Sequence, residues 1–354
     1  MDQSKGWMRG VLIGLGLLLA CCALIVYLAD PYQAYRFANW YTPSYSNGEQ
    51  PYYNAGLARH SDYDAVFLGS SMVENTLVSQ VDERFGTRCI KLPFQGGMAA
   101  SHAQALRVAF DTRPLTHVFY GMDMYSFVRD PSFSNFEMPK YLYETNPFNR
   151  IAYLLNGDVL LRRIPGLLHR RWIGGEREPV TADTIYAWAL DGRIRYGEKS
   201  VLGSYDFSQP AKEMLAYDAF ADHVYANFDR FVRPFLEAHP DTEFIFYFPP
   251  YSTLQWYMMR QDGHLHAILR TMEQLAELLL PYPNARLHDF TAHLDWIEDF
   301  SLYRDYSHYS PEVNAWIVDA LADGDFGVND LSDIWVSMDA LKEIAENFPA
   351  NGGG

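Results

Sequence analysis

Three residues of this 354-residue chain have the types and the order that nucleophilic catalysis requires. Ser71 ends a Gly-Ser-Ser run, and Asp305 precedes His308 by three residues. A serine hydroxyl is a weak nucleophile that needs an adjacent base, and an imidazole can act as that base near neutral pH. A carboxylate three residues away can reach the imidazole and stabilise its protonated form. The pattern predicts an acyl-transfer triad of Ser71, His308 and Asp305.

Each part of this triad is weak evidence when it is taken alone. A Gly-Ser-Ser run is usually a turn, because glycine and serine favour turns. Asp305 and His308 could instead belong to the start of a helix that begins near Pro311. The order of the three residues and their placement after predicted strands give the combination its weight.

Short apolar runs alternate with helical patterns and predict the sheet that would position these residues. We expect strands at residues 65–68, 89–92, 117–120, 243–248 and 285–289, and helices near residues 98–110, 212–238 and 263–280 and from residue 311. Such alternation is typical of a parallel sheet that is covered on both faces. Ligands bind at the carboxyl ends of such strands, where the Gly-Ser-Ser run, a Gly-Gly turn and Gly121-Met122-Asp123 would all lie.

The motifs around these residues resemble those of the SGNH (GDSL-type) hydrolases. The run Phe67-Leu68-Gly69-Ser70-Ser71 is similar to the first block of that family, and Asp305-Tyr306-Ser307-His308 is similar to its final D-x-x-H block. The turn at Gly96 and Gly97 is similar to the second block, whose glycine lends a backbone N–H to the oxyanion hole. The resemblance covers residues 64–125 and 242–322. It implies a flavodoxin-like three-layer α/β/α sandwich with a mainly parallel five-stranded sheet.

Two positions depart from the motifs of that family. Ser70 stands where the first block has aspartate, and Asp123 stands where the third block, G-x-N-D, has asparagine. Asparagine donates a hydrogen bond to the oxyanion, and losing one such donor typically costs about 2.7–4 kcal/mol of transition-state stabilisation. The oxyanion candidates are therefore the backbone N–H groups of Ser71, Gly97 and Gly96, with Asp123 as the unusual member of the set.

Residues 10–29 form an uncharged apolar run that is long enough to cross a bilayer. Twenty helical residues span about 30 Å, which is the thickness of the hydrocarbon core. A cleaved signal peptide would have a shorter apolar region, and a lipoprotein signal would turn polar after Cys21, so an uncleaved anchor is favoured. Lys5 and Arg9 precede the run and Asp30 follows it, which predicts a cytoplasmic N-terminus and an extracytoplasmic remainder.

The anchor and the sheet pattern divide the chain into four parts. We interpret residues 1–29 as a cytoplasmic tip and membrane anchor, 30–61 as a connecting segment, 62–325 as the α/β domain and 326–354 as a C-terminal extension. Residues 130–209 break the alternation and are interpreted as an insertion. The arginine pairs between Arg162 and Arg171 could contact anionic lipid headgroups or an anionic polymer, although a solvated loop or short helix is the simpler interpretation.

Composition and the remaining motifs exclude several classes of partner. The net charge of −16 disfavours nucleic acid, because phosphate binding needs a basic field. Cys89 is the one cysteine outside the apolar run, so the folded part needs no internal disulfide. His288, Asp289 and His293 could ligate a metal, but their spacing matches no strong motif, and we expect no metal there.

These observations lead to one functional hypothesis, one alternative and a third, weaker possibility, a metal-dependent hydrolase that would use His288, His293 and His308. The chain resembles membrane-anchored extracytoplasmic branches of the SGNH hydrolases, such as alginate O-acetylation and teichoic acid D-alanylation proteins. The resemblance implies a serine esterase or O-acyltransferase of the bacterial cytoplasmic membrane, without a cofactor. It would act on acyl esters of a cell-envelope or secreted polysaccharide, or on a small acyl ester, through an acyl-serine intermediate. The alternative is a catalytically weakened module that binds a polymer or an envelope-assembly protein.

Overall fold

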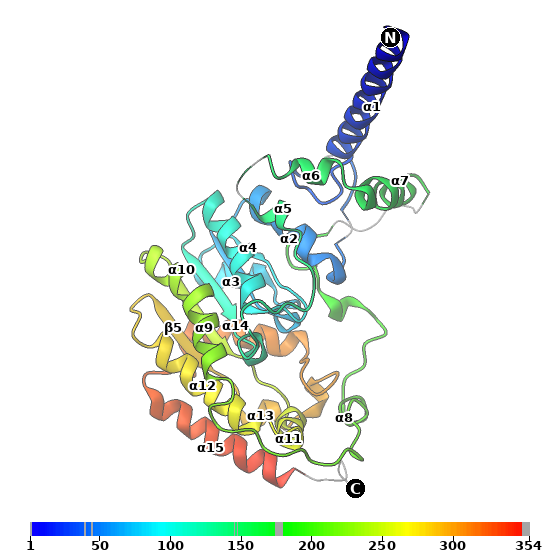
Figure 1. The fold of residues 1–354 in the computed structure, drawn as a ribbon. Coiled ribbons are helices and arrows are strands. Elements are labelled where there is room, and N and C mark those ends of the chain that lie inside the picture. The colour runs from blue at the N-terminus through cyan, green and yellow to red at the C-terminus, as the bar shows by residue number, and fades with distance from the viewer. Residues whose placement is uncertain are drawn as a thin grey trace. The chain divides into compact units, whose positions relative to one another are not determined.

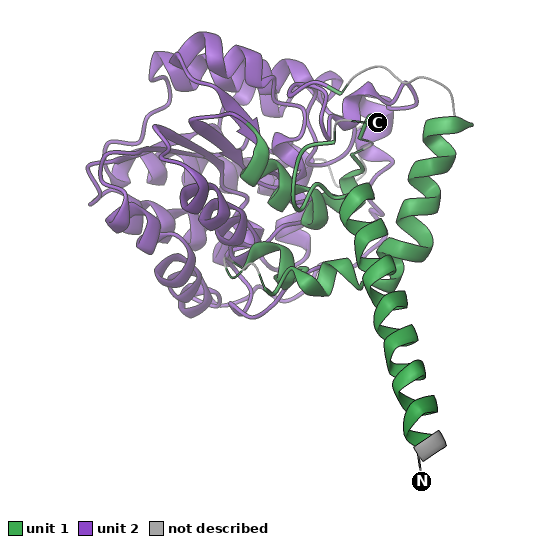
Figure 2. Ribbon diagram, turned by 90° about the horizontal axis from the view of Figure 1, so that it is seen from above, with its two compact units in different colours: residues 1–61, 138–180 green, residues 62–137, 181–354 purple. Residues whose placement is uncertain are grey.

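The chain divides into two compact units in the computed structural model, which describes residues 2–38, 40–43, 45–144, 146, 148–173 and 180–348. Unit 1 comprises residues 1–61 and 138–180, and unit 2 comprises residues 62–137 and 181–354 (Figure 2). The sheet and all residues of the predicted triad belong to unit 2. The apolar N-terminal run belongs to unit 1.

Unit 2 is built on a five-stranded, all-parallel sheet with the strand order β2-β1-β3-β4-β5. The strands are β1 (Ala65–Leu68), β2 (Cys89–Lys91), β3 (His117–Gly121), β4 (Glu243–Phe248) and β5 (Ala285–Asp289). Every residue of β1, an interior strand, is buried, which explains why this strand is a continuous apolar run rather than an alternating one. The predicted α/β class and parallel five-stranded sheet are confirmed.

The strand order creates a switch point between β1 and β3. The chain leaves β1 toward β2 on one side and returns to β3 on the other side, with register Ala65↔His117 through Leu68↔Tyr120. Because parallel crossovers are right-handed, the connections that run in these opposite directions cover opposite faces of the sheet. The carboxyl ends of β1 and β3 therefore open a crevice between the two sets of helices, where ligands bind in such sheets.

The helices of unit 2 pack in two groups around this sheet (Figure 1). In the first group α3 (Val78–Phe85) packs against α14 (Pro311–Asp323). The second group consists of α4 (Ala99–Thr112), α9 (Ala221–Phe231), α10 (Arg233–Ala238), α11 (Thr253–Gln261), α12 (Leu265–Leu279) and α15 (Leu331–Asn347). Short helices occupy the loops: η2 (Ser71–Val73), η3 (Met124–Ser126), η5 (Trp188–Leu190), α8 (Glu198–Leu202), α13 (Leu294–Ile297) and η6 (Phe300–Leu302).

One predicted helix begins later than its sequence pattern indicated. The pattern predicted a helix from residue 212, whereas the first helix of that region begins at Ala221. The Lys212 N–H donates to the Gln261 carbonyl and the Leu215 N–H donates to the Gly263 carbonyl. The backbone of residues 212–215 therefore bonds to the chain at and just after the end of α11. These hydrogen bonds take the place of helical ones, so the helix begins only at Ala221.

Unit 1 contains a long N-terminal helix and several short ones (Figure 1). They are α1 (Asp2–Ala29), η1 (Asn47–Glu49), α2 (Gln50–His60), α5 (Lys140–Tyr143), α6 (Ile151–Leu154), the π-helix η4 (Val159–Arg163) and α7 (Ile164–Trp172). The N-terminal helix α1 packs against α6 and η4. Among the described residues, its stretch Ser4–Ala29 is the one helix long and apolar enough to cross a membrane, a property that signal sequences share.

Candidate active site

Ser71 lies three positions after the last residue of β1, at the first position of η2. The turn depends on Gly69, whose φ of +152° lies in a region that side chains disfavour. A Cβ at Gly69 would come within 2.7 Å of the Val73 side chain and 3.0 Å of the Gly121 carbonyl oxygen. The Ser70 side chain accepts a hydrogen bond from the Met72 N–H at 3.4 Å and caps η2. A glycine turn and a serine cap thus place Ser71 at the carboxyl edge of the sheet.

The three residues of the predicted triad form a continuous chain of hydrogen bonds. The Ser71 Oγ lies 2.8 Å from the His308 Nε2. The His308 Nδ1 lies 2.9 Å from each carboxylate oxygen of Asp305. The carboxylate fixes the proton of a neutral His308 on Nδ1, which leaves Nε2 free to accept the Ser71 proton. The structure therefore brings together the three residues, 237 positions apart at most, whose catalytic roles remain a prediction.

The Asp305 carboxylate is held in its ionised form. Burial alone would raise its pKa, but hydrogen bonds from the His308 ring and from the N–H groups of His308 and Ser307 lower the pKa to about 2. Those N–H groups donate to the Asp305 Oδ1 at 2.8 and 3.0 Å. Because of the D-x-x-H spacing, a single turn supplies backbone N–H donors to the Asp305 carboxylate. The same carboxylate also contacts the His308 Nδ1 and so orients the imidazole.

Trp188 and Arg304 also contact the triad, and the sequence pattern did not reveal them. The Trp188 indole N–H donates to the Ser71 carbonyl oxygen at 3.2 Å. The rings of Trp188 and His308 meet edge to face, with centroids 5.7 Å apart and an interplanar angle of 87°. The Arg304 guanidinium lies 4.5 Å from the centroid of the Trp188 ring and its Nε lies 3.2 Å from Asp305. Trp188 comes from the stretch interpreted as an insertion, where no periodicity marks it.

The backbone donors near Ser71 differ in their availability. The Gly97 N–H already donates to the Phe94 carbonyl at 2.7 Å, so in this conformation it stabilises a turn. The N–H groups of Ser71 and Gly96 have no acceptor among the described residues. The Gly96 carbonyl accepts a hydrogen bond from the Asn135 amide at 2.7 Å, which holds the turn from outside. Ser71 and Gly96 therefore retain free donors for an oxyanion hole.

Asp123 lies after β3, on the other side of the switch point from Ser71. Its carboxylate accepts the Tyr125 N–H at 3.1 Å and caps η3. Burial raises the pKa of Asp123 above its ordinary value, and the neighbouring Tyr251 hydroxyl, the Tyr125 N–H and the Ser70 hydroxyl oppose that rise. A carboxyl group whose neutral form is favoured by burial thus stands where the related motif has an amide.

A cavity of about 250 Å³ adjoins the triad. It is lined by Asp123, Tyr125, Tyr251, Gln255, Met258, Met259, Asp262, Tyr306 and Ser307. Tyr306 and Ser307 belong to the loop that carries Asp305 and His308, and the Ser252 hydroxyl fixes that loop by donating to the Tyr306 carbonyl at 2.6 Å. The cavity therefore offers phenol, carboxyl and amide groups to a molecule bound beside the triad.

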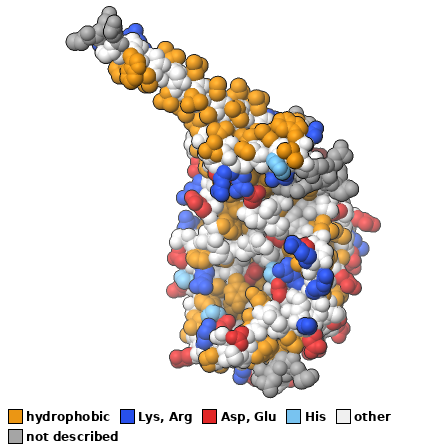
Figure 3. All heavy atoms as spheres, turned by 90° about the vertical axis from the view of Figure 1, so that its right-hand side faces the viewer, with side chains coloured by type: hydrophobic (Ala, Val, Ile, Leu, Met, Phe, Trp, Pro, Cys, Tyr) orange, Lys and Arg blue, Asp and Glu red, His pale blue; other side chains and the backbone are white. Residues whose placement is uncertain are grey.

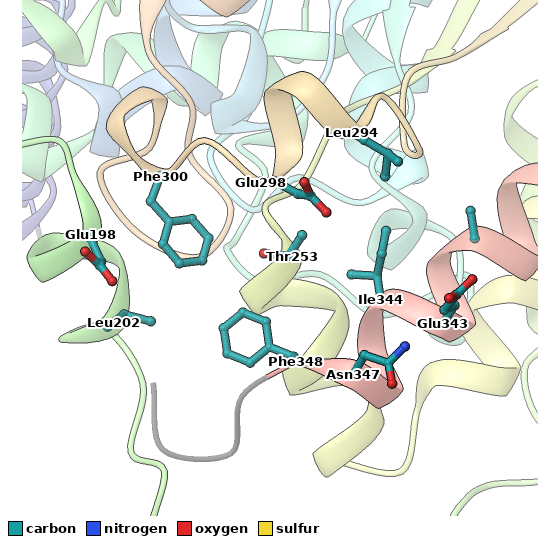
Figure 4. Close-up of a pocket in the computed structure, with 11 residues that line it drawn as sticks. Glu198, Leu202, Thr253, Leu294, Glu298, Phe300, Glu343, Ile344, Asn347 and Phe348 are labelled. Carbon is teal, nitrogen blue, oxygen red and sulfur yellow. The ribbon is translucent and has the colours of Figure 1, made fainter. Parts of the chain in front are cut away.

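A second cavity, of about 500 Å³, involves none of the triad residues (Figure 4). Phe300 and Phe348 form an apolar wall with ring centroids 6.3 Å apart. Three exposed glutamates, Glu198, Glu298 and Glu343, surround it. The cavity is thus an acidic and apolar recess that is built partly from α15.

The three residues considered as metal ligands, His288, Asp289 and His293, make structural contacts. The His288 Nδ1 lies 2.7 Å from the Asp325 carbonyl oxygen. The His293 ring packs against the Trp316 ring with centroids 4.7 Å apart. The Asp289 carboxylate accepts the Thr291 hydroxyl at 2.6 Å. Within the part of the chain that the structure describes, no three His, Cys, Asp or Glu side chains are arranged to hold a metal ion.

The chain has only a distant likeness to known proteins. No protein-family model matches the sequence. No curated protein matches it either. Among solved structures, the chain is similar to a Streptococcus pneumoniae protein provisionally described as a platelet activating factor, with 11% identity and a TM-score of 0.42. The similarity covers 78% of this chain and 92% of that protein.

Proposed function

We propose that this chain is a serine ester hydrolase or O-acyltransferase that works through an acyl-serine intermediate. The observation that carries the proposal is the hydrogen-bonded chain from the Ser71 Oγ through His308 to Asp305, with separations of 2.8 and 2.9 Å. Those separations fall within the reach that proton transfer requires. The position of Ser71 at the switch point of a parallel sheet adds support, since ligands reach that edge.

Each group has a defined role in this reaction. The Ser71 Oγ attacks the ester carbonyl carbon while its proton moves to the His308 Nε2, and Asp305 stabilises the resulting imidazolium. The tetrahedral oxyanion accepts hydrogen bonds from the N–H groups of Ser71 and Gly96. When the tetrahedral species collapses, the ester C–O bond breaks and the leaving alcohol takes the proton from His308. Water or another hydroxyl then attacks the acyl-serine, His308 takes its proton and returns it to Ser71.

The proposed substrate is an acyl ester of a carbohydrate polymer. The cavity beside the triad supports this class, because tyrosine rings cover sugar faces and carboxyl and amide oxygens accept sugar hydroxyls. No lysine, arginine or histidine lines that cavity among the described residues, so it favours neutral or cationic groups over anionic ones. The final acceptor is water in a hydrolase or a sugar hydroxyl in a transferase.

The proposed setting is the bacterial cytoplasmic membrane. The length and apolar composition of α1 support a single membrane-spanning anchor. Lys5 and Arg9 on its N-terminal side support a cytoplasmic N-terminus, and unit 2 then lies outside the cytoplasm. An acylated polymer of the cell envelope would be accessible from that side, as would envelope-assembly proteins.

Hydrolysis of p-nitrophenyl acetate by the full chain in detergent tests the proposal. We expect turnover in the wild type and its loss in Ser71→Ala. Ser70→Ala is the matched control, because it removes the adjacent hydroxyl and its long 3.4 Å bond from the Met72 N–H but keeps the nucleophile. We expect it to lose only part of the activity. Turnover that survives in Ser71→Ala would contradict the proposed role of Ser71.

One observation favours the alternative of a polymer-binding module. An ionised Asp123 would oppose the oxyanion, and Asp123 replaces the asparagine of the related motif. Calorimetry with an acylated polysaccharide and its deacylated form separates the two functions. Binding of both forms without release of the acyl group would favour the binding module. Release of the acyl group by the wild type but not by Ser71→Ala would favour the enzyme.

A further inference from the structure

Unit 1 exposes several large apolar side chains close to the C-terminal end of α1. Residues 157–172 form one continuous helical segment that includes η4 and α7, and α6 lies just before it. Leu161 and Trp172 on this segment are 73% and 71% exposed. The apolar patch consists of these two residues together with Phe148, Ile151, Leu155 and Ile173. Because α6 and η4 pack against α1, the patch adjoins the proposed anchor.

The opposite side of the same helical segment is anchored in unit 1. Val159, Ile164 and Leu167 are buried, at 1, 5 and 4% exposure. The Arg163 guanidinium pairs with Glu49 and Asp158. Since one side packs inward and carries its own charge partners, the exposed apolar side chains are not a fragment of the core that awaits a neighbouring segment. They form an outward surface on a helix that is fixed in place.

The patch is accompanied by positive charge in a chain that is strongly acidic overall. Residues 157–172 contain four arginines and a single acidic residue, whereas the whole chain has a net charge of −16. Arg170 and Arg171 are exposed, and so is His169. The Arg162 side chain is 81% exposed and, among the described residues, pairs with the exposed Asp158. Large apolar side chains beside exposed arginines are typical of helices that lie in a membrane interface.

The segment that follows α1 places, against the end of that helix, side chains of the types that are enriched where helices leave a bilayer. The Arg36 guanidinium donates to the carbonyls of Tyr27 and Leu28 at 2.7 and 2.9 Å. The Trp40 indole N–H donates to the Leu28 carbonyl at 3.2 Å, and the Tyr41 hydroxyl donates to the Asp30 carbonyl at 2.7 Å. Tryptophan, tyrosine and arginine are interfacial anchors, so this belt marks the level at which α1 meets the headgroups.

A polar contact ties that level to the helix bearing part of the patch. The Tyr153 hydroxyl of α6 donates to the Asp30 carboxylate at 3.1 Å. The same carboxylate accepts the N–H groups of Ala34 and Tyr35 at 2.8 and 2.9 Å. The helix that carries Ile151 of the patch is therefore held beside the aromatic and arginine belt at the end of α1. Figure 3 shows hydrophobic side chains along the length of α1.

We infer that α6, η4 and α7 lie flat in the membrane interface beside α1, with the apolar patch among the upper acyl chains and Arg162, Arg170 and Arg171 on anionic phospholipid headgroups. This inference rests on the membrane-spanning role proposed for α1 and is independent of the chemistry at Ser71. The occupant of the patch is thus the bilayer in which α1 itself is embedded. Such a second contact would restrain unit 1 at the surface, which a single helix leaves free to rotate and tilt.

Depth-dependent fluorescence quenching of the full chain in lipid nanodiscs tests the position of the patch. Cys21, Cys22 and Cys89 are replaced by alanine, and an environment-sensitive label is placed on Leu161→Cys. A second variant retains Cys21 as the label site within α1. A third carries Val336→Cys, which is as exposed as Leu161, at 73%, but lies in unit 2. We expect lipids brominated along the acyl chain to quench the labels at 161 and 21 and to leave the label at 336 unquenched.

The label positions separate failure of this inference from failure of the anchor. Quenching at Cys21 with a label at 161 that behaves like the label at 336 would overturn the inference and leave the anchor intact. That result would assign the patch to a protein partner instead. A Cys21 label that is also unquenched would overturn both the anchor and the inference. Neither outcome depends on catalysis, so the proposed activity is tested separately.

The headgroup contact has its own test. We expect the quenching of the label at 161 to increase when phosphatidylglycerol is added to phosphatidylcholine nanodiscs, and added salt to reduce that increase. Arg170→Glu combined with Arg171→Glu should abolish the increase. The matched control is Arg107→Glu combined with Arg230→Glu, which reverses two exposed arginines of unit 2. An increase of equal size in the patch variant and the control would overturn the assignment of anionic headgroups.

Discussion

The indole N–H of Trp188 donates to the carbonyl oxygen of Ser71 at 3.2 Å. This bond fixes the backbone of the candidate nucleophile from a segment that lies 117 positions away in the sequence. The same ring meets the His308 imidazole edge to face and carries the Arg304 guanidinium above it. Trp188 therefore contacts both residues of the Ser71–His308 pair. It links residues 181–190 to the candidate active site.

Trp188→Phe should lower kcat/KM about fivefold, because one hydrogen bond to the Ser71 backbone contributes about 1 kcal/mol and the ring packing is kept. Trp188→Ala should lower it further, since the ring also positions His308. Steady-state kinetics with p-nitrophenyl acetate measure both effects. Trp335→Phe is the control, because it too removes one indole hydrogen bond, to Glu273, far from the triad in sequence. Equal losses in the two phenylalanine variants would show that the contact has no special role.

Asp305→Asn should lower kcat by roughly 10⁴-fold, because an amide beside Nδ1 favours the wrong tautomer of the histidine. The fold should persist, since the amide oxygen can still accept the N–H groups of Ser307 and His308. Stopped-flow or long-time assays give the rate, and thermal melting checks the fold. Asp299→Asn is the control, because Asp299 accepts the Ser301 N–H in a similar way without touching the triad. A loss of less than tenfold in Asp305→Asn would contradict the role given to the carboxylate.

Asp305 also makes stability depend on pH at the acidic end. Its pKa of about 2 lies below the ordinary value of 3.8, so the folded state binds fewer protons than the unfolded state between these values. The stabilisation is complete above pH 4 and is lost as the pH falls toward 2, by about 2 kcal/mol. Chemical unfolding at pH 5 and pH 3 should show a smaller decrease in Asp305→Asn than in the wild type. An equal decrease in both proteins would contradict the assignment.

Asp123→Asn should raise kcat/KM relative to the wild type, and the ratio should increase with pH. The reason is that Asp123 ionises as the pH rises through its raised pKa, after which its charge opposes the oxyanion, whereas asparagine stays neutral and can donate. We expect kcat/KM to rise on the order of tenfold at neutral pH. This gain is smaller than the rate effect of a well-placed oxyanion-hole donor. Asp262→Asn, in the same cavity, should give no such trend. A ratio that falls with pH would contradict this account of Asp123.

Lys91 links the loop after Ser71 to the segment that carries Trp188. Its ionisation should give the free energy of unfolding a second pH dependence. Its ammonium group is buried and donates to the carbonyls of Glu74 and Asp183, both at 2.8 Å. Burial lowers the pKa of Lys91 to about 8 from 10.5, although the charges of Asp183 and Glu74 oppose the change. The folded state thus binds fewer protons than the unfolded state between those values, and stability rises with pH there.

The expected gain is about 2 kcal/mol between pH 7 and pH 9.5. Above about pH 10 the ionisation of tyrosines in the unfolded state acts in the opposite direction, so the comparison ends below that pH. Unfolding curves in detergent for the wild type and Lys91→Met measure the effect, and the stability of the wild type relative to the variant should rise with pH. Lys199→Met, at an exposed lysine, should leave the slope unchanged. A constant difference between the wild type and Lys91→Met would contradict the prediction.

The sequence was most informative where local pattern and chemistry coincide. All five strands were predicted within one residue of their observed ends. The interior strands β1, β3 and β4 were marked most clearly, because each is a short apolar run that ends at or just before a glycine or a proline. The positions of Ser71, Asp305 and His308 followed from strand ends and from the D-x-x-H spacing, both of which are local signals.

Long-range contacts account for what the sequence did not reveal. Trp188 and Arg304 reach the triad through loops without periodicity, so neither the type nor the spacing of these residues marked them. The engagement of the Gly97 N–H with Phe94 depends on the detailed turn, which the Gly-Gly pair alone does not specify. Residues 138–180 form a compact unit with residues 1–61, and the apolar pattern of η4 and α7 does not distinguish a surface loop from an interfacial helix. The division of the chain into an anchor, a connecting segment, an insertion and an extension stays a prediction.

Labelling with a fluorophosphonate probe, followed by mapping of the modified peptide, tests the central claim most directly. The probe forms a stable bond only with a serine that an adjacent base activates. The account predicts that Ser71 is modified in the wild type and in Ser70→Ala, and that His308→Ala abolishes modification although Ser71 is still present. Absence of label on a folded wild-type protein, or label on a serine other than Ser71, would contradict it.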